Sequence, residues 1–398
     1  MFFKKIKVLA GDIELKKKIS RPFNLLSIEF LDLLSKEIFK NGNISKYPDL
    51  ATFAFWSRKR NILSISKKYS KNEIRFGLGL IYHIAPSNMP VNFIYSFAFG
   101  IISGNSNVIK VSEKNFDQVN IFINCFNKIS KRKKFRDIHK SNVFIRYKKE
   151  DELITRYYSS ICDARIVWGG DETVKKINKI EIPPKSKSIN FPDRYSFCIL
   201  NSNKIKNLDL QSLKQLAKNF YNDTYLIDQN ACTSPHLIIW VGNIKEKDKK
   251  LFWNSVEHEV KKKYNFENIF SLNKYNKLLN DILDNKFLTN ITKHGNIIYR
   301  ILINKIDKNF DTKKFKGQWG YFYEYNVKNI DEISKLVSPK FQTLSYYGFT
   351  KKELNKLFEK NNFDGIDRVV PVGRTLDMGL IWDGYDLPIT LSRLMEIK

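Results

Sequence analysis

The stretch that decides the fold covers residues 76–102, FGLGLIYHIAPSNMPVNFIYSFAFGII. Its first part, residues 76–85, is apolar and runs into a turn at residues 86–90, PSNMP, so we predict a buried strand that enters a turn. The apolar run 91–102 suits a helix, which the pair Gly104-Asn105 ends. A buried strand followed directly by a helix is the first unit of an α/β pattern.

The same alternation continues along the chain. We expect a strand at residues 108–111, a helix at 116–129, a strand at 166–168 and a helix from residue 171, which has acidic residues at its positive end. Strands that alternate with helices indicate an α/β domain with a largely parallel sheet. In such sheets ligands bind beyond the carboxyl ends of the strands.

Length and composition set the wider limits. A chain of 398 residues is long for one core, so we expect two domains. Hydrophobic residues make up 42% and aromatic residues 14%, which argues against global disorder. The net charge of +28 is spread along the chain and gathers only in short clusters such as residues 131–134 and 261–263. We therefore expect no nucleic-acid site, but a positive surface that attracts an anionic substrate or cofactor.

The cysteine pattern bears on metal binding, and the length of the apolar runs bears on the cellular location of the protein. The cysteines Cys125, Cys162, Cys198 and Cys232 form no CxxC pair, and the five histidines are scattered, so we expect no metal site. Asp12 and Glu14 interrupt the basic N-terminus before any signal-peptide core can form. The longest apolar stretch, residues 93–103, is too short to span a membrane. We expect a cytoplasmic protein.

Residues 228–236, DQNACTSPH, carry the candidate nucleophile. They follow the aromatic-rich segment 220–225 and precede an apolar strand at 237–240, so Cys232 lies in a turn between ordered elements. Functional residues concentrate on such connections, and a partly solvated thiol can ionise. The alternative is that Cys232 is a small buried hydrophobic residue. Cys125, Cys162 and Cys198 have apolar surroundings and are expected in the core.

The ends of the predicted strands carry further candidates. The Asn88 amide can donate to a developing oxyanion, although an asparagine often stabilises its own turn. Lys110, followed by Ser112 and Glu113, ends a strand where a ribose or phosphate would lie, although such a lysine is often only solvated. The pair Gly169-Gly170 before a helix would let a dinucleotide approach the backbone closely, which is weak evidence alone.

Together these motifs resemble the aldehyde dehydrogenase superfamily and, within it, the LuxC-type acyl-CoA reductases. The resemblance covers roughly residues 70–398 and rests on residues 83–92 (HIAPSNMPVN), 103–110 (SGNSNVIK), 228–235 (DQNACTSP), 370–374 (VPVGR) and 382–387 (WDGYDL). It implies a Rossmann-type NAD(P)-binding domain at residues 70–200 and an α/β catalytic domain at 201–370. We expect the N-terminal helical segment 1–69 to pack on the cofactor domain. We expect the tail 371–398 to return to that domain or to a subunit interface.

The resemblance also implies a reaction. Cys232 would attack an acyl thioester and hold the acyl group, while Asn88 and the backbone N–H of Cys232 stabilise the oxyanion. A reduced nicotinamide would then deliver hydride and release a fatty aldehyde. In the superfamily the residue matching Lys110 contacts the adenosine ribose, and the turn matching Gly169-Gly170 adjoins the pyrophosphate.

Two departures from the superfamily pattern matter. Aldehyde-oxidising relatives have a glutamate that activates water, which would fall near residues 189–191, but Asp193 is the nearest acid. Its absence favours acyl transfer or reduction over hydrolysis. Glu113 stands where a carboxylate binds a ribose 2′-hydroxyl and repels a 2′-phosphate. LuxC-type enzymes are expected to use NADPH, so we expect NADPH and leave NADH open.

The resemblance extends to partners and leaves alternatives. The substrate would be an acyl-CoA or an acylated partner protein, an acyl-protein synthetase is a plausible partner, and we expect a homo-oligomer. The alternatives are a hydrolytic or coenzyme A-acylating aldehyde dehydrogenase, and a non-enzymatic scaffold for an acyl-transfer partner. His236 is a weak candidate base, because Pro235 makes helical spacing to Cys232 doubtful. We expect Arg374, Asp383 and Asp386 to form a structural ion pair that ties the tail to the first domain.

Overall fold

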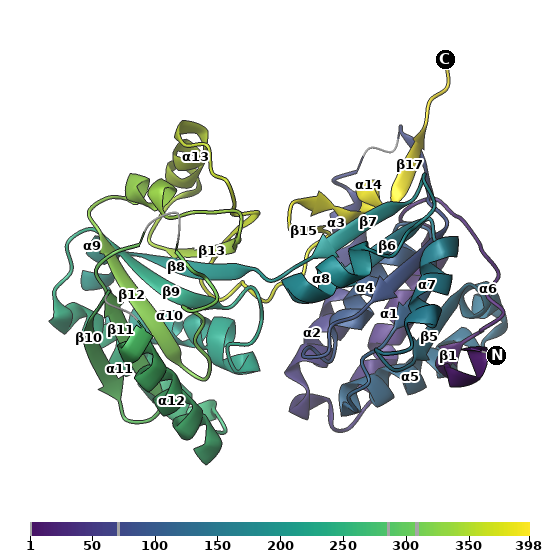
Figure 1. Ribbon diagram of the computed structural model, residues 1–398. Coiled ribbons are helices and arrows are strands. Elements are labelled where there is room, and N and C mark those ends of the chain that lie inside the picture. The colour runs from purple at the N-terminus through teal and green to yellow at the C-terminus, as the bar shows by residue number, and fades with distance from the viewer. Residues whose placement is uncertain (1, 70–71, 285–286, 307–309) are drawn as a thin grey trace. The chain divides into compact units, whose positions relative to one another are not determined.

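The computed structural model describes residues 2–69, 72–284, 287–306 and 310–398. The chain divides into two compact units, Met1–Asp193 with Met378–Lys398, and Arg194–Asp377. Each unit contains its own β-sheet with helices on its faces (Figure 1). The predicted α/β class is confirmed.

The main sheet of the first unit has the strand order β1-β5-β4-β3-β6-β7. These strands are β1 (Lys7–Gly11), β3 (Leu80–Ile84), β4 (Ser106–Lys110), β5 (Asn142–Arg146), β6 (Ala164–Trp168) and β7 (Lys187–Phe191). All neighbours pair in parallel except β1, which is antiparallel to β5. The chain adds β4 and β5 on one side of β3 and then crosses to add β6 and β7 on the other. The direction of strand addition therefore reverses beside β3.

Helices cover both faces of this sheet. They are α1 (Leu25–Phe39), α2 (Pro48–Trp56), α3 (Lys59–Ser66), α4 (Asn92–Ile102), α5 (Asp117–Ser130), α6 (Arg136–Lys140), α7 (Glu152–Ile161) and α8 (Asp171–Asn178), with 3-10 turns η1 (Phe2–Lys5), η2 (Ile44–Lys46) and η3 (Lys133–Phe135). Because side chains alternate along a strand, Tyr82 on β3 packs with α7, whereas His83 faces α4 and contacts Ser96 at 2.7 Å. All five residues of β3, LIYHI, are buried, as is typical of a strand covered on both faces.

The prediction of one strand over residues 76–85 is wrong in detail. The structure has two strands here, β2 (Ile74–Gly77) and β3. The extended conformation is interrupted between them at Gly79, whose φ is +142°. A side chain at Gly79 would meet the Asp163 carboxylate, so only glycine fits there. Strand β2 leaves the main sheet and pairs antiparallel with β17 (Ser392–Met395) from the C-terminal end of the chain. This long-range pairing leaves no local signal in the apolar run.

The sheet of the second unit has the order β10-β11-β12-β9-β8-β13-β14. Its strands are β8 (Tyr195–Asn201), β9 (Pro235–Val241), β10 (Leu288–His294), β11 (Ile298–Ile303), β12 (Tyr321–Val327), β13 (Phe341–Tyr347) and β14 (Arg368–Pro371). Only the β10–β11 pair is antiparallel among the pairs within this sheet's described residues. Its helices are α9 (Ser202–Lys206), α10 (Leu210–Thr224), α11 (Glu246–Lys263), α12 (Asn268–Asp284) and α13 (Lys351–Lys360), with 3-10 turns η4 (Tyr225–Ile227) and η5 (Ile330–Lys335).

Two apolar clusters bury the faces of the second sheet. Ile238 and Trp240 of β9 point to the side of α10 and α11, and Leu237 and Ile239 point to the side that Leu278 of α12 covers. The central strand β9, which follows Cys232, is buried throughout. It therefore gives the preceding loop a rigid support.

The last residues of the chain belong to the first unit. They form β15 (Ile381–Trp382), β16 (Tyr385–Asp386), α14 (Leu387–Thr390) and β17. In the described part of the chain, no helix is long and apolar enough to cross a membrane. No group of three or more His, Cys, Asp or Glu side chains placed to hold a metal occurs among the same described residues.

Candidate functional site

The first unit brings most of the predicted site residues to one edge of its sheet. Strands β3, β4 and β6 are parallel neighbours, so their carboxyl ends lie together. Asn88 lies in the loop after β3, Lys110 ends β4, and Gly169-Gly170 follow β6. The reversal of strand order beside β3 opens a crevice at this edge in doubly wound sheets, where ligands characteristically bind.

Asn88 is exposed, and its amide makes no hydrogen bond among the residues that the structure describes. The turn is instead closed by backbone bonds, such as that from the Asn92 N–H to the Met89 carbonyl at 3.5 Å. The alternative that Asn88 stabilises its own turn is therefore not supported. Its amide N–H groups remain available to a ligand.

Lys110 is held at the edge of the sheet without a carboxylate partner. Its Nζ lies 4.5 Å from the centre of the Tyr147 ring. Within the described residues it makes no ion pair. Burial lowers the pKa of Lys110, and the nearby charge of Glu113 opposes that effect. Tyr147 is itself fixed by hydrogen bonds to Tyr82 and, at 2.8 Å, to Thr155. A cation in this position suits a hydroxyl or an anionic group of a ligand.

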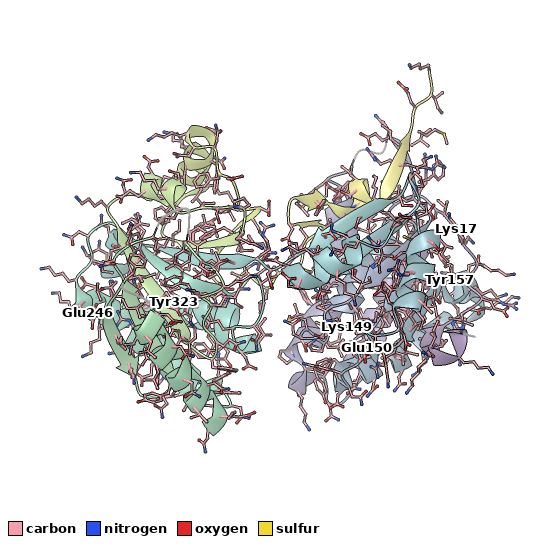
Figure 2. The ribbon with its side chains drawn as sticks, viewed as in Figure 1. Lys17, Lys149, Glu150, Tyr157, Glu246 and Tyr323 are labelled. Carbon is pink, nitrogen blue, oxygen red and sulfur yellow. The ribbon has the colours of Figure 1, made fainter. Side chains whose placement is uncertain are left out.

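Ser112 and Glu113 follow Lys110 in the loop after β4. The Ser112 hydroxyl accepts the Lys114 N–H at 3.2 Å, which closes a local turn. Glu113 accepts the backbone N–H of Lys149 at 2.8 Å, so its carboxylate is tied to the loop that carries Lys149 and Glu150 (Figure 2). The Glu113 carboxylate therefore has a fixed place near Lys110.

The Gly169-Gly170 turn brings bare backbone to the start of α8. A Cβ at Gly169 would lie 3.1 Å from Thr173, and one at Gly170 would lie 3.0 Å from an Asp193 oxygen. The amide oxygens of Asn92, which opens α4, and Asn190, near the end of β7, are buried without a hydrogen-bond partner in the described chain. The glycine turn and Lys110 fit the anionic part of a ligand such as a dinucleotide, and the two amide oxygens fit its hydrogen-bond donors.

Cys232 belongs to the second unit, in the loop between η4 and β9. It is partly exposed, whereas Cys125, Cys162 and Cys198 are buried, as predicted. Burial raises the pKa of the Cys125 thiol to about 11 and of Cys162 to about 12, and it also raises that of Cys198. Cys232 is therefore the cysteine that solvent can reach.

Neighbouring strands hold the backbone of Cys232. The Ser196 hydroxyl, on β8, donates to the Cys232 carbonyl at 2.6 Å and accepts the N–H of Thr343, on β13, at 3.2 Å. A lateral series of hydrogen bonds therefore links Cys232 to the amino edge of the parallel sheet. This edge is more rigid than a free loop.

The loop before Cys232 is strained and tightly constrained. Asp228 and Gln229 have φ values of 57° and 59°, a left-handed conformation that non-glycine residues rarely adopt. The Gln229 amide donates to the carbonyls of Pro235 at 3.0 Å and Tyr321 at 3.2 Å, and its oxygen accepts the Gly320 N–H at 3.2 Å. These bonds hold the conformation that presents Cys232.

A second segment, residues 316–321, lies against the loop that carries Cys232, residues 228–234. Trp319 donates its N–H to the Asp228 carbonyl at 3.3 Å, and Gln318 donates to Asn230. The Trp319 carbonyl accepts from Lys274 of α12 at 2.8 Å, and that ammonium also contacts the carbonyls of Asn296 and Ile297. Burial lowers the pKa of Lys274 to about 7.

The secondary candidates behave as structural residues. His236 is buried on β9, contacts the Gly317 carbonyl through Nδ1 at 2.9 Å, and has its pKa lowered by burial to about 3, so it is a poor base. Arg374 pairs locally with Asp377 at 2.5 Å, and the expected ion pair of the tail stays a prediction. Asp386 caps α14 and accepts from Tyr69 at 3.1 Å.

Comparison with known proteins identifies the family. Residues 59–279, more than half of the chain, match the family model described as acyl-CoA reductase (LuxC). The chain belongs to this LuxC family. The matched residues include Asn88, Lys110, Gly169, Gly170 and Cys232, whereas the motifs at residues 370–387 lie beyond them.

This LuxC-family chain also resembles curated and solved proteins. A long-chain acyl-protein thioester reductase of Aliivibrio fischeri is 24% identical over 308 residues, which cover 74% of this chain and 58% of that relative. Lactaldehyde dehydrogenase from Escherichia coli matches with a TM-score of 0.64 at 12% identity, covering 93% of this chain and 86% of that chain. An NAD-dependent benzaldehyde dehydrogenase from Corynebacterium glutamicum matches with a TM-score of 0.58 at 10% identity, covering 92% and 84%. These likenesses show the aldehyde dehydrogenase fold.

Several residues of the LuxC-family site were missed by the sequence reasoning. Gln229 stands in the quoted motif but has no recognisable role there, and Ser196 and Lys274 belong to no motif. The partners of Gln229 lie 6 to 92 residues away in the chain, those of Ser196 lie 36 and 147 residues away, and those of Lys274 lie 22 to 45 residues away. No local signal could have identified them.

Proposed function

We propose that this protein reduces an acyl thioester to an aldehyde through an S-acyl intermediate on Cys232. The observation that carries the proposal is the contrast among its cysteines: Cys232 is partly exposed on a constrained loop, and the others are buried. Membership of the LuxC family gives the class of reaction. The second unit is accordingly the catalytic domain, and the first is the NAD(P)-binding domain.

The chain's own residues would act as follows. Cys232, as thiolate, attacks the thioester carbonyl, a new thioester forms on Sγ, and the coenzyme A or carrier thiolate leaves and takes up a proton. Asn88 and the backbone N–H of Cys232 donate to the oxyanion, and such a donor contributes about 3 kcal/mol in comparable sites. The strained loop 228–229 keeps Sγ in one place, because Gln229 holds it by hydrogen bonds to three backbone groups.

The carboxyl edge of the first sheet fits a nicotinamide dinucleotide. When bound there, a reduced nicotinamide would supply the hydride needed to reduce the acyl group to an aldehyde. Lys110 would contact the adenosine ribose, and the Gly169-Gly170 backbone would adjoin the pyrophosphate. We propose NADPH from the family and keep NADH open, because Glu113 has a fixed carboxylate beside Lys110.

The cofactor proposal can be tested by binding alone. Glu113→Gln should strengthen NADPH binding, because it removes a negative charge that repels the 2′-phosphate. It should weaken NADH binding, because it removes the carboxylate that accepts a hydrogen bond from the ribose 2′-hydroxyl. Lys110→Met should weaken both and leave acylation of Cys232 unchanged. Titration of intrinsic fluorescence measures these affinities, and equal affinities in wild type and both variants would refute the assignment.

The relative from Aliivibrio fischeri is named for a long-chain acyl-protein thioester. The chain spans 58% of that relative's length. We propose a long-chain acyl group here too, delivered as acyl-CoA or on an acylated protein such as an acyl-protein synthetase. A homo-oligomer remains our expectation.

The alternatives differ in chemistry. A hydrolytic aldehyde dehydrogenase needs a base near residues 189–191, where β7 carries only Ile189, Asn190 and Phe191. A non-enzymatic scaffold would not need a solvent-accessible cysteine on a strained loop. These observations favour the reductase.

Intact mass spectrometry tests the proposal. The protein is incubated with a series of acyl-CoAs without nicotinamide, next to Cys232→Ser, and NADPH is added afterwards. We expect an acyl adduct that is lost in the variant and is discharged as aldehyde by NADPH. An adduct that persists in Cys232→Ser, or that is released as free acid, would overturn the proposal.

A further inference from the structure

The pairing of β4 with β5 places Lys110 beside Tyr147 on one face of the first sheet. Lys110 ends β4 and pairs in register with Ile145 of β5, and Tyr147 follows Ile145 two residues later. Side chains two residues apart on an extended chain point to the same face. The Tyr147 ring accordingly packs in the same buried cluster as Val108 and Ile145. Its centre lies 4.5 Å from Lys110 Nζ, well within the range of a cation–π contact.

The ring of Tyr147 is fixed in its place. The residue is 3% exposed, and its hydroxyl is hydrogen-bonded to Tyr82 of β3 and, at 2.8 Å, to Thr155 of α7. Both partners are themselves buried, and the Tyr82 ring contacts the Tyr158 ring with a centre-to-centre distance of 5.5 Å. Burial raises the pKa of Tyr147 to about 12, so its phenol is neutral at physiological pH. Lys110 therefore rests on a rigid, uncharged ring.

A neutral ring orients the ammonium without cancelling its charge. Lys110 makes no ion pair within the described residues, and the nearby Glu113 carboxylate accepts the backbone N–H of Lys149 at 2.8 Å. A carboxylate in contact with Lys110 would have to be displaced by an incoming anion or hydroxyl. Lys110 is partly exposed and Tyr147 is buried, so the ring lies on the protein side of the ammonium. The N–H donors on the other side stay open to a ligand.

We propose that Tyr147 is a positioning residue whose ring holds the Lys110 ammonium at the carboxyl end of β4, ready to contact the dinucleotide. This inference rests on the proposed contact of Lys110 with the adenosine ribose, and it goes beyond that contact by naming the group that orients the lysine. Because Tyr147 is buried, it would act on the ligand through Lys110. Removing the ring should therefore matter only while Lys110 is present.

A double-mutant cycle tests this dependence. The dissociation constant of NADPH, and in parallel that of NADH, is measured by isothermal titration calorimetry for wild type, Tyr147→Leu, Lys110→Met and the double variant. Tyr147→Leu should weaken binding by about 3- to 10-fold, which is the range of a partly desolvated cation–π contact. In the Lys110→Met background the same change should alter binding by less than about 2-fold. A merely structural role of Tyr147 would weaken binding equally in both backgrounds and would overturn the inference.

Tyr147→Phe is the matched control, because it keeps the ring and removes only the hydroxyl. It leaves the buried hydroxyls of Tyr82 and Thr155 without their partner, so Tm should fall. The affinity for NADPH should stay within about 2-fold of wild type, since the ring face is kept. A folded Tyr147→Phe protein that binds as weakly as Tyr147→Leu would assign the effect to the hydroxyl and refute the role of the ring.

A second measurement needs no change at Tyr147 and so does not depend on the folding of Tyr147→Leu. In a protein with 13C-labelled lysine, the ε-CH2 resonance that disappears in Lys110→Met belongs to Lys110. The π electrons of a ring shield protons that lie over its face. We therefore expect this resonance upfield of the other lysine ε-CH2 signals in wild type, and a position among those signals would overturn the inference.

The two proposals fail in different ways. If Lys110→Met binds NADPH and NADH with wild-type affinity, the cofactor assignment is wrong, and the role of Tyr147, which depends on it, falls as well. If Lys110→Met weakens binding and a folded Tyr147→Leu binds as wild type, the cofactor assignment stands and the role of Tyr147 is refuted.

Discussion

Gln229→Met tests whether the nucleophile loop is held by one buried amide. Gln229 is 1% exposed, and its side chain bonds to the carbonyls of Pro235 and Tyr321 and to the N–H of Gly320. Methionine keeps the length and volume but removes all three bonds. A neutral hydrogen bond contributes about 1 kcal/mol, and the deserted backbone groups stay buried, so we expect a loss of at least about 3 kcal/mol. For a unit of this size that lowers Tm by roughly 6–12 °C.

The same variant should affect chemistry as well as stability. Loss of the three bonds weakens the constraint on the left-handed φ values at Asp228 and Gln229 and leaves backbone bonds such as that from the Trp319 N–H to the Asp228 carbonyl, so we expect the loop to relax and Sγ to shift. A displacement of about 1 Å can cost a factor of about 100 in rate, so acylation of Cys232 should slow by that order at temperatures where the variant is folded.

Gln318→Ala is the matched control for this experiment. Gln318 is also a glutamine beside the loop, but it is exposed, and Asn230 is the one acceptor of its side-chain amide among the described residues. We expect a change below about 0.5 kcal/mol. Thermal melts and intact-mass acylation rates check both variants. A Gln229→Met protein with wild-type Tm and wild-type acylation would refute the view that this amide locks the loop.

Three further predictions concern acyl transfer and pH. Asn88→Ala should slow acylation of Cys232 by about 10²–10³-fold, and the neighbouring Ser87→Ala should keep the wild-type rate. Stopped-flow measurement of acylation gives both rates. Equal rates for the two variants would show that Asn88 is not part of the oxyanion site. Lys274 has its pKa lowered to about 7 in the folded state, so the folded protein binds fewer protons and its stability rises with pH from about 7 toward 10. The free energy of unfolding of wild type relative to Lys274→Met should therefore increase by about 2 kcal/mol between pH 7 and 9, and a constant difference in urea titrations would contradict this. Burial raises the pKa of Asp223 to about 6, so its contribution is complete below about pH 4 and is lost as the pH rises through 6. Wild type should lose about 2 kcal/mol relative to Asp223→Asn between pH 4 and 7, and parallel Tm profiles would exclude the effect.

Much of the fold followed from local pattern. The helices predicted at 91–102 and 116–129 occur as α4 and α5, and the strands at 108–111 and 166–168 occur as β4 and β6. The spacing of apolar residues and the glycines between the segments suffice to predict these elements, because each is buried against neighbours close in the chain. The error at residues 76–85 arose because β2 pairs with β17, more than 300 residues away. No pattern in the sequence revealed β1 either, which pairs with β5 at the edge of the sheet among the described residues.

The candidate site, like the fold, could be predicted from the sequence only in part. That Asn88, Lys110 and Gly169 would share one sheet edge follows from their places after parallel strands, a rule that the sequence can supply. Only the structure could show that the Asn88 amide and the Lys110 ammonium are available to a ligand, because their availability depends on which groups surround them.

The sequence by itself determined the class of the fold, the loop position of Cys232 and the family pattern, since these depend on residue order and local chemistry. The tertiary structure decided which polar groups support that cysteine. Gln229 bonds to Tyr321 of β12, and Ser196 bonds to Cys232 and to Thr343 of β13, so the folded sheet brings these groups together. Hydrogen bonds and charge act over a few ångströms of space whatever the separation along the chain, so the groups that tune a site become visible only after the chain has folded.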